Sequence, residues 1–161
     1  MGILEATSEP ITLFGGDASP VISQLLKDAA ASYLQANRAE AILWSAQVID
    51  PECLPVYFAL YKFYFYKFRL ADAEKAALLG LKAAAQKCGI PAEWKQLSFA
   101  DADWESATGP QHFYLFTLKA LAFIRLRMGR RDESLEILLK LLELDPKDTV
   151  GSSVIRDLAR S

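Results

Sequence analysis

Apolar residues recur along most of the chain at the spacing of one face of an α-helix. After Ser19-Pro20, which supplies an N-cap and a first-turn proline, a first helix is predicted. Its inner face consists of Ile22, Leu25, Leu26, Ala29 and Tyr33. A turn at Asn37-Arg38 leads to a second helix, AEAILWSAQVI, which ends at Asp50-Pro51. The pattern predicts a helical hairpin over about residues 20–50.

A second hairpin is predicted over about residues 54–88, and its first helix is the most aromatic part of the chain. The stretch YFALYKFYFYKF, residues 57–68, holds eight of the eighteen aromatic residues. Its apolar positions do not alternate with a period of two, so a helix is favoured over a strand. The inner face would be Tyr57, Leu60, Tyr61, Tyr64 and Phe68. The second helix, residues 70–87, has a side of small residues that allows close backbone approach: Ala73, Ala76, Ala77, Gly80 and Ala84.

A third hairpin is predicted over about residues 111–145, with Leu118, Leu121 and Ala122 on the inner face of its first helix and a turn at Gly129-Arg130. A short capping helix follows over about residues 148–159. Its apolar residues are Val150, Val154, Ile155 and Leu158.

Two segments lack a helical repeat. Residues 1–19 are interpreted as an N-terminal arm, and residues 89–110 as an insert that contains a short helix in PAEWKQLS. The rest of the insert is either ordered by packing of Trp94, Phe99 and Trp104 on the hairpins or disordered. One domain, residues 20–161, accounts for the remainder.

The hairpins resemble the tetratricopeptide repeat (TPR) family, whose unit of about 34 residues is two antiparallel helices. In the third hairpin the matching residues are Leu121, Ala122, Gly129, Leu138 and Pro146, and in the second they are Leu60, Tyr64, Ala73 and Gly80. Ser134 and Arg125 depart from the family pattern. The resemblance implies an all-α fold in which three hairpins stack as a short right-handed superhelix, with the first helices lining its concave side.

That concave side defines the candidate binding groove. In the second hairpin it would carry Phe58, Lys62, Phe65 and Tyr66, together with Arg69. In the third it would carry Phe116, Lys119, Phe123 and Arg127, together with His112, Leu126 and Arg130. The first hairpin offers small or polar residues there: Ser23, Lys27, Ala30 and Ala31.

Four phenylalanines that each expose about 100 Å² would form a patch near the upper limit for a monomer. Three explanations of what covers this apolar patch remain open. The arm, the insert or burial in the core covers it within the chain; an acidic-apolar peptide or helix of another protein covers it; or a second copy covers it in a homodimer.

The charge and cysteine content of the chain limit the classes of partner that are expected. A formal net charge of −2 provides no field to attract nucleic acid or an anionic membrane. The chain has no signal-peptide pattern and no stretch long enough to span a membrane. Cys53 and Cys88 lack metal or redox spacing, which favours a reducing cytoplasm and buried or idle thiols.

No pattern of catalytic or metal-binding residues is present. His112 is the single histidine and is expected at the surface, and Asp101, Asp103 and Glu105 lack the glycine and glutamate that complete a calcium loop. Some TPR proteins grip a terminal carboxylate, but the corresponding positions here are Gln24, Asp28, Ala59, Phe116 and Ala120, so that mode should be absent. We therefore expect no enzyme activity, metal or cofactor. The sequence predicts a non-enzymatic adaptor or chaperone, or alternatively a self-assembling structural protein that uses the same face.

Overall fold

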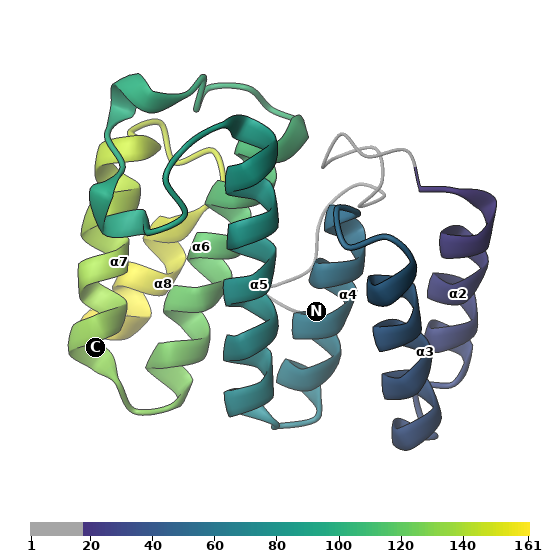
Figure 1. Cartoon of the computed structure of the whole chain (residues 1–161). Helices are drawn as coiled ribbons and strands as arrows, with labels where there is room; N and C mark the ends of the chain where they lie inside the picture. Colours follow the sequence, from purple (N-terminus) through teal and green to yellow (C-terminus); the bar gives the residue numbers. More distant parts are fainter. Residues whose placement is uncertain (1–17) are drawn as a thin grey trace.

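The structure, a computed structural model, describes residues 18–161, and within this range it has seven α-helices, two short 3-10 helices and no strand (Figure 1). The α-helices are α2 (Pro20–Ala31), α3 (Ala36–Ile49), α4 (Leu54–Tyr66), α5 (Leu70–Cys88), α6 (Gly109–Arg127), α7 (Arg131–Leu144) and α8 (Ser152–Arg160). The 3-10 helices are η1 (Trp94–Gln96) and η2 (Phe99–Asp101). The prediction of an all-α chain is confirmed. The predicted arm lies outside the described residues except for Ala18 and Ser19.

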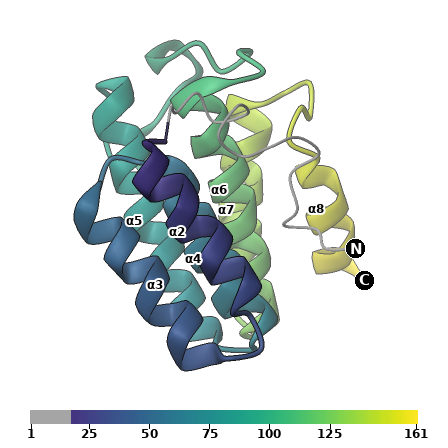
Figure 2. The same ribbon diagram turned by 90° about the vertical axis from the view of Figure 1, so that its right-hand side faces the viewer.

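Consecutive helices pack antiparallel in one row, with α2 and α3 at one end and α7 and α8 at the other (Figure 1). In the view turned by 90°, α2, α4 and α6 lie on one side and α3 and α5 on the other (Figure 2). No helix within residues 18–161 is long and apolar enough to cross a membrane.

The start of α2 was predicted correctly from its sequence, and its end was not. The Ser19 hydroxyl accepts a hydrogen bond of 3.2 Å from the Ile22 amide and caps α2, as predicted. The predicted turn at Asn37-Arg38 is wrong, because α2 already ends at Ala31 and α3 begins at Ala36. The turn between them is closed by the Gln35 amide, which donates 2.8 Å to the Ser32 carbonyl.

The second and third hairpins turn with the same backbone geometry. The Arg69 amide donates to the Tyr64 carbonyl and the Arg130 amide to the Arg125 carbonyl, both at 2.9 Å, and a left-handed residue precedes each arginine. That residue is Gly129 (φ 82°) in the third hairpin and Phe68 (φ 59°) in the second. The left-handed turn takes Phe68 off the helix face and leaves it 79% exposed, so its predicted place on the inner face is wrong.

The core of the row is built around α4, α5 and α6. The aromatic stretch is helical as predicted, and Tyr57, Leu60, Tyr61 and Tyr64 are buried. The small side of α5 is buried too, and Gly80 lies at a close contact with both neighbouring helices. A Cβ atom added to Gly80 would lie 3.0 Å from the Tyr57 Cβ and 3.2 Å from the Phe113 Cζ. The small residues thus let α5 fit tightly between α4 and α6.

Ion pairs link each second helix to the next hairpin in the same way. Arg69, just before α5, pairs with Glu40 of α3 at 2.9 Å, and Arg130, just before α7, pairs with Glu74 of α5 at 2.7 Å. Arg125 also donates to Glu74, at 2.8 Å. Glu40 and Glu74 are each the fifth residue of their helix. We call this arrangement the Arg–Glu bracket.

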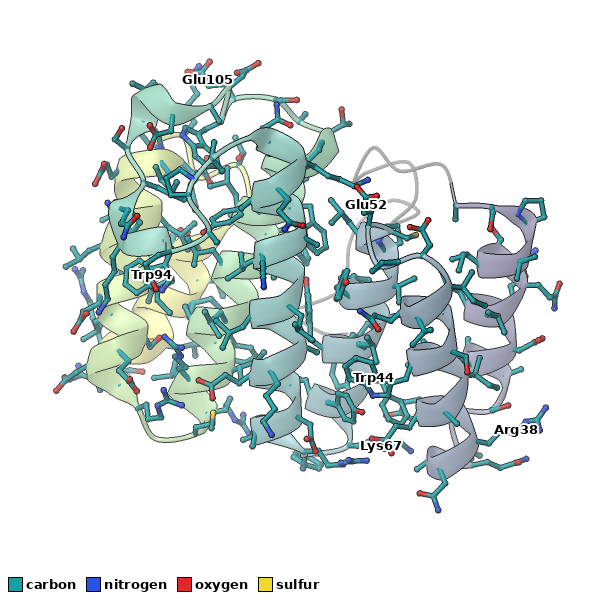
Figure 3. The ribbon with its side chains drawn as sticks, in the orientation of Figure 1. Arg38, Trp44, Glu52, Lys67, Trp94 and Glu105 are labelled. Carbon is teal, nitrogen blue, oxygen red and sulfur yellow. The ribbon has the colours of Figure 1, made fainter. Side chains whose placement is uncertain are left out.

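Tyr64 adds a polar link between α3 and α4. Its oxygen accepts 2.7 Å from the indole nitrogen of Trp44, which projects from α3 toward α4 (Figure 3), and its hydroxyl donates to Glu40. Burial and the carboxylate raise the pKa of Tyr64 to about 12. The hydroxyl therefore stays protonated as a donor.

The insert is ordered against the third hairpin, as one of the two alternatives predicted. Trp94 and Trp104 are buried, and the Trp104 indole donates 3.1 Å to the Ser98 carbonyl. Phe99 is 46% exposed, so its predicted packing is wrong. The short helix predicted in PAEWKQLS is the single 3-10 turn of η1. Lys140 of α7 donates 2.6 Å to the Leu97 carbonyl and holds this segment in place.

The predicted capping helix is α8, which packs on α7 and α6. Ile155 is buried as predicted, and Val150 is buried in the loop before the helix. Val154 and Leu158, predicted to pack on the row, are 51% and 46% exposed, because the contact face of this short helix is formed by Ile155 and Ala159.

Candidate functional site

A groove of about 670 Å³ runs between α2 and α4 on the side of the row where the first helices lie. We call it the α2–α4 groove. Its walls are mostly apolar, and the charged residues among the described residues that line it are both lysines. The lining residues are Ser23, Leu26, Lys27, Ala29, Ala30, Tyr33, Leu43, Pro55, Phe58, Ala59, Lys62, Phe63 and Tyr66.

The α4 wall is aromatic and carries one lysine. Phe58, Lys62 and Tyr66 follow one another at four-residue spacing, which places them on the same stripe of the helix. The Lys62 Nζ lies 5.5 Å from the centroid of the Phe58 ring, within range of a cation–π interaction. These three predicted site residues therefore share one surface.

The α2 wall is made of small residues, and this is why the groove is open. Ala29, Ala30 and Ser23 face the large rings of α4 across the space. The first hairpin had offered only Ser23, Lys27, Ala30 and Ala31, and sequence reasoning placed the aromatic groove between the second and third hairpins instead. Leu26, Tyr33, Leu43, Pro55 and Phe63 were missed as lining residues. Small residues on α2 opposite aromatic residues on α4 would have been the signal.

The α4–α6 half of the predicted groove is closed by ring contacts. Phe58 meets Phe116 edge to face with centroids 5.8 Å apart, and Phe65 meets Phe123 at 5.2 Å. Phe58, Phe116 and Phe123 are buried. The expectation that four phenylalanines each expose about 100 Å² is therefore wrong, because three of the rings are buried and the four rings contact one another in two pairs.

Lys119 and His112 are buried on α6, at 6% and 8% exposure. The Lys119 Nζ lies 4.2 Å from the Phe116 ring centroid, and burial lowers the pKa of Lys119 to about 8. Burial also lowers the pKa of His112, and nearby Asp145 opposes that shift. The prediction of a surface histidine is wrong, because His112 lies at the start of the fully buried stretch of α6.

The arginines predicted at the groove lie elsewhere: two form ion pairs between helices and one is exposed to solvent. Arg69 and Arg130, predicted on the groove face, lie in the Arg–Glu brackets instead. Arg127 is exposed at the end of α6 and does not line the α2–α4 groove. The positive charge at the groove therefore comes from Lys27 and Lys62.

A second hollow of about 440 Å³ lies between α5, η1 and α7. Its lining carries charges of both signs, and several are already paired: Lys95 with Glu136 at 3.8 Å, and Arg125 with Glu74. This surface offers no preference for a charged ligand, in contrast to the α2–α4 groove.

The chemistry available at the α2–α4 groove is that of binding. Its polar groups are two ammonium groups, two phenols and one hydroxyl, set among apolar side chains. Within residues 18–161 no group of three or more His, Cys, Asp or Glu side chains is placed to hold a metal ion. Burial raises the pKa of both thiols, Cys53 and Cys88, which keeps them in the less reactive protonated form.

The chain is similar to the "Uncharacterized 19.8 kDa protein in nifW 5′ region" of Azotobacter chroococcum mcd 1. The two are 31% identical over 131 residues, which cover 80% of this chain and 73% of that protein. The chain belongs to the same family as this protein. No family model matches the chain, and no solved structure matches it. For this family the structure of residues 18–161 provides an all-α row of antiparallel helices with a groove at one end.

Proposed function

We propose that the protein is a non-enzymatic, TPR-like interaction module whose α2–α4 groove binds an acidic-apolar peptide or helix of another protein. The observation that supports this most directly is the groove itself, a space of about 670 Å³ with apolar walls and lysines as its charged lining residues. Its volume lies within the usual range for ligand sites. An amphipathic helix could insert its apolar face there while its carboxylates meet Lys27 and Lys62.

Several features support the assignment to TPR-like hairpins stacked as a short superhelix. Gln35 and Arg69 precede α3 and α5 with similar backbone angles, and they are separated by 34 residues, the length of the family's unit. Ala39, Ala73 and Ser134 occupy the same place in α3, α5 and α7, and all three are fully buried. The two Arg–Glu brackets join equivalent positions of successive hairpins, which agrees with the same alignment of the repeats.

A defined probe pair tests the proposed binding. One is a fluorescein-labelled amphipathic peptide with glutamates on one helical face and leucine and phenylalanine on the other, and the second has lysines in place of the glutamates. Fluorescence anisotropy should show the acidic peptide binding at least tenfold more tightly, because its charge complements the groove. Equal binding of the two peptides would contradict the proposal.

Two variants locate the binding. Ala30→Trp fills the groove from an exposed position on α2 and should abolish binding, whereas Ala41→Trp, at an exposed position on α3, should not. Lys27→Glu with Lys62→Glu should weaken binding of the acidic peptide at least tenfold, and Lys75→Glu on α5 should leave it unchanged. A purified protein whose mass in solution is that of a dimer, and which Ala30→Trp converts to a monomer, would favour the self-assembling alternative.

A further inference from the structure

The chain's own N-terminal segment has the chemistry that the α2–α4 groove selects. Residues 1–17, MGILEATSEPITLFGGD, lie outside the described residues. They include three acidic side chains and no lysine or arginine. Their large apolar residues are Ile3, Leu4, Ile11, Leu13 and Phe14. This segment is itself an acidic-apolar peptide.

The segment is joined to the groove. It leads directly into α2, which forms one wall, and Gly15-Gly16 permits the chain to reverse direction just before the Ser19 cap. Seventeen extended residues reach about 55 Å, while the twelve residues of α2 are about 18 Å long. The segment is therefore long enough to follow the whole groove.

We propose that residues 1–17 are an intramolecular ligand of the α2–α4 groove, which an external acidic-apolar partner has to displace. The inference rests on the proposed function, because it assigns the same groove the same ligand chemistry. A short tether holds a ligand at an effective concentration in the millimolar range. The segment can therefore occupy the groove even with modest intrinsic affinity. The apparent affinity for a partner is then the intrinsic affinity multiplied by the fraction of molecules whose groove is unoccupied.

Cross-linking of the full chain tests where the segment binds. A carbodiimide joins a carboxylate to a lysine only when the two are in contact, and Glu5 and Glu9 are far enough from α2 in sequence to be informative. With an equal mixture of ¹⁴N- and ¹⁵N-labelled protein, we expect products that join Glu5 or Glu9 to Lys27 or Lys62 within one chain. Products of mixed isotope content would assign the groove to a second copy and overturn the proposal. Equally frequent links to Lys75 on α5 would also overturn it, because they would show no preference for the groove.

Competition on the full chain provides an independent test. Replacing Leu13 and Phe14 by serine weakens the internal ligand without touching a described residue, so the acidic probe peptide should bind the variant about tenfold more tightly than the unmodified protein. Thr7→Ala with Ser8→Ala is the matched control and should leave the affinity unchanged. If the probe binds all three proteins equally, this inference fails while the proposed function stands. If it binds none of them, the proposed function fails, and the cross-links alone decide whether the segment occupies the groove.

Discussion

The positive charge of Lys119 is unfavourable in the folded state because the side chain is buried. It is 6% exposed, its Nζ stacks on Phe116, and its pKa falls from an ordinary value near 10.5 to about 8. A lysine whose pKa is lowered in the folded state destabilises that state below the lowered value. Partial compensation comes from Asp148, which raises the pKa of Lys119, and from the ring.

We predict that Lys119→Met raises the free energy of unfolding at pH 7 by about 1–3 kcal/mol. The gain should shrink as the pH rises from about 8 toward 10, because the lysine of the unmodified protein then becomes neutral in the folded state. Urea denaturation of both proteins across this range measures the difference. Lys82→Met, at an exposed position on α5, is the control and should change stability by less than about 0.5 kcal/mol. A less stable Lys119→Met variant at pH 7 would show that the ammonium group stabilises this site.

The solvent exposure of individual residues was harder to predict from the sequence than the helices were. His112 and Lys119 are polar residues of α6, yet both are buried, and Asp145 and Asp148, about thirty residues later, lie near enough to raise the pKa of His112 and of Lys119, respectively. Phe68 is a large apolar residue of the kind usually found in a core. It nevertheless occupies the left-handed turn position that Gly129 occupies in the third hairpin. Burial of these residues depends on distant neighbours and on turn geometry, which helical periodicity does not contain.

Among the elements, α5 packs closely between its two neighbours. Gly80 lies between Tyr57 of α4 and Phe113 of α6, and both neighbours are buried, so neither can move aside without disturbing the core. We predict that Gly80→Val lowers the free energy of unfolding by about 2 kcal/mol or more through overpacking. Thermal or urea denaturation followed by circular dichroism measures this loss.

Lys82→Val provides the matched control, since it places the same β-branched residue at an exposed position of α5. Its cost should be limited to helix propensity, about 0.5 kcal/mol. Similar losses in the two variants would indicate that the space around Gly80 is not limiting.

Helices were more predictable than the groove between them. Caps, prolines and helical periodicity are local signals, so the ends of α4, α5, α6 and α7 lie within a few residues of their predicted places. The turn after α2 contains neither glycine nor proline and was misplaced. The position of the groove depends on how far α2 stands from α4, which is set by side-chain size across two helices, and the pattern along one helix does not reveal it.

At the scale of the whole molecule, the first hairpin is attached less extensively than the others. Every residue from His112 to Ile124 of α6 is buried, whereas α2 buries Ile22 and Ala29. The packing of α3 on α4 is also sparser than that of α5 on α4 or on α6. Among the helices α2 to α7, α2, which forms one wall of the groove, therefore has the smallest share of buried residues.

We predict that amide hydrogen exchange at neutral pH is fastest, among the helices α2 to α7, in α2 and α3, and slowest in α5 and α6. Exchange measured by mass spectrometry should show α2 opening without global unfolding. Bound acidic probe peptide should slow exchange in α2 and α4 while leaving α7 unchanged. Equal protection of α2 and α6 would mean that the row unfolds as one unit.

The Arg–Glu bracket also bears on how such a chain can change length. Glu40 meets Arg69 and Glu74 meets Arg130 through equivalent helix positions, so the first and second hairpins each present a glutamate to the next hairpin, which supplies the arginine. A duplicated copy of residues 35–68, inserted after residue 68, would bring its own Glu40 to face Arg69, while the original Glu40 would meet an added copy of Gln35 rather than an arginine. A single Gln-to-Arg exchange in that copy would restore the missing pair. One substitution would therefore be enough to keep the ion pair at both junctions of a chain lengthened by one helical hairpin, although the helices on either side would still have to fit.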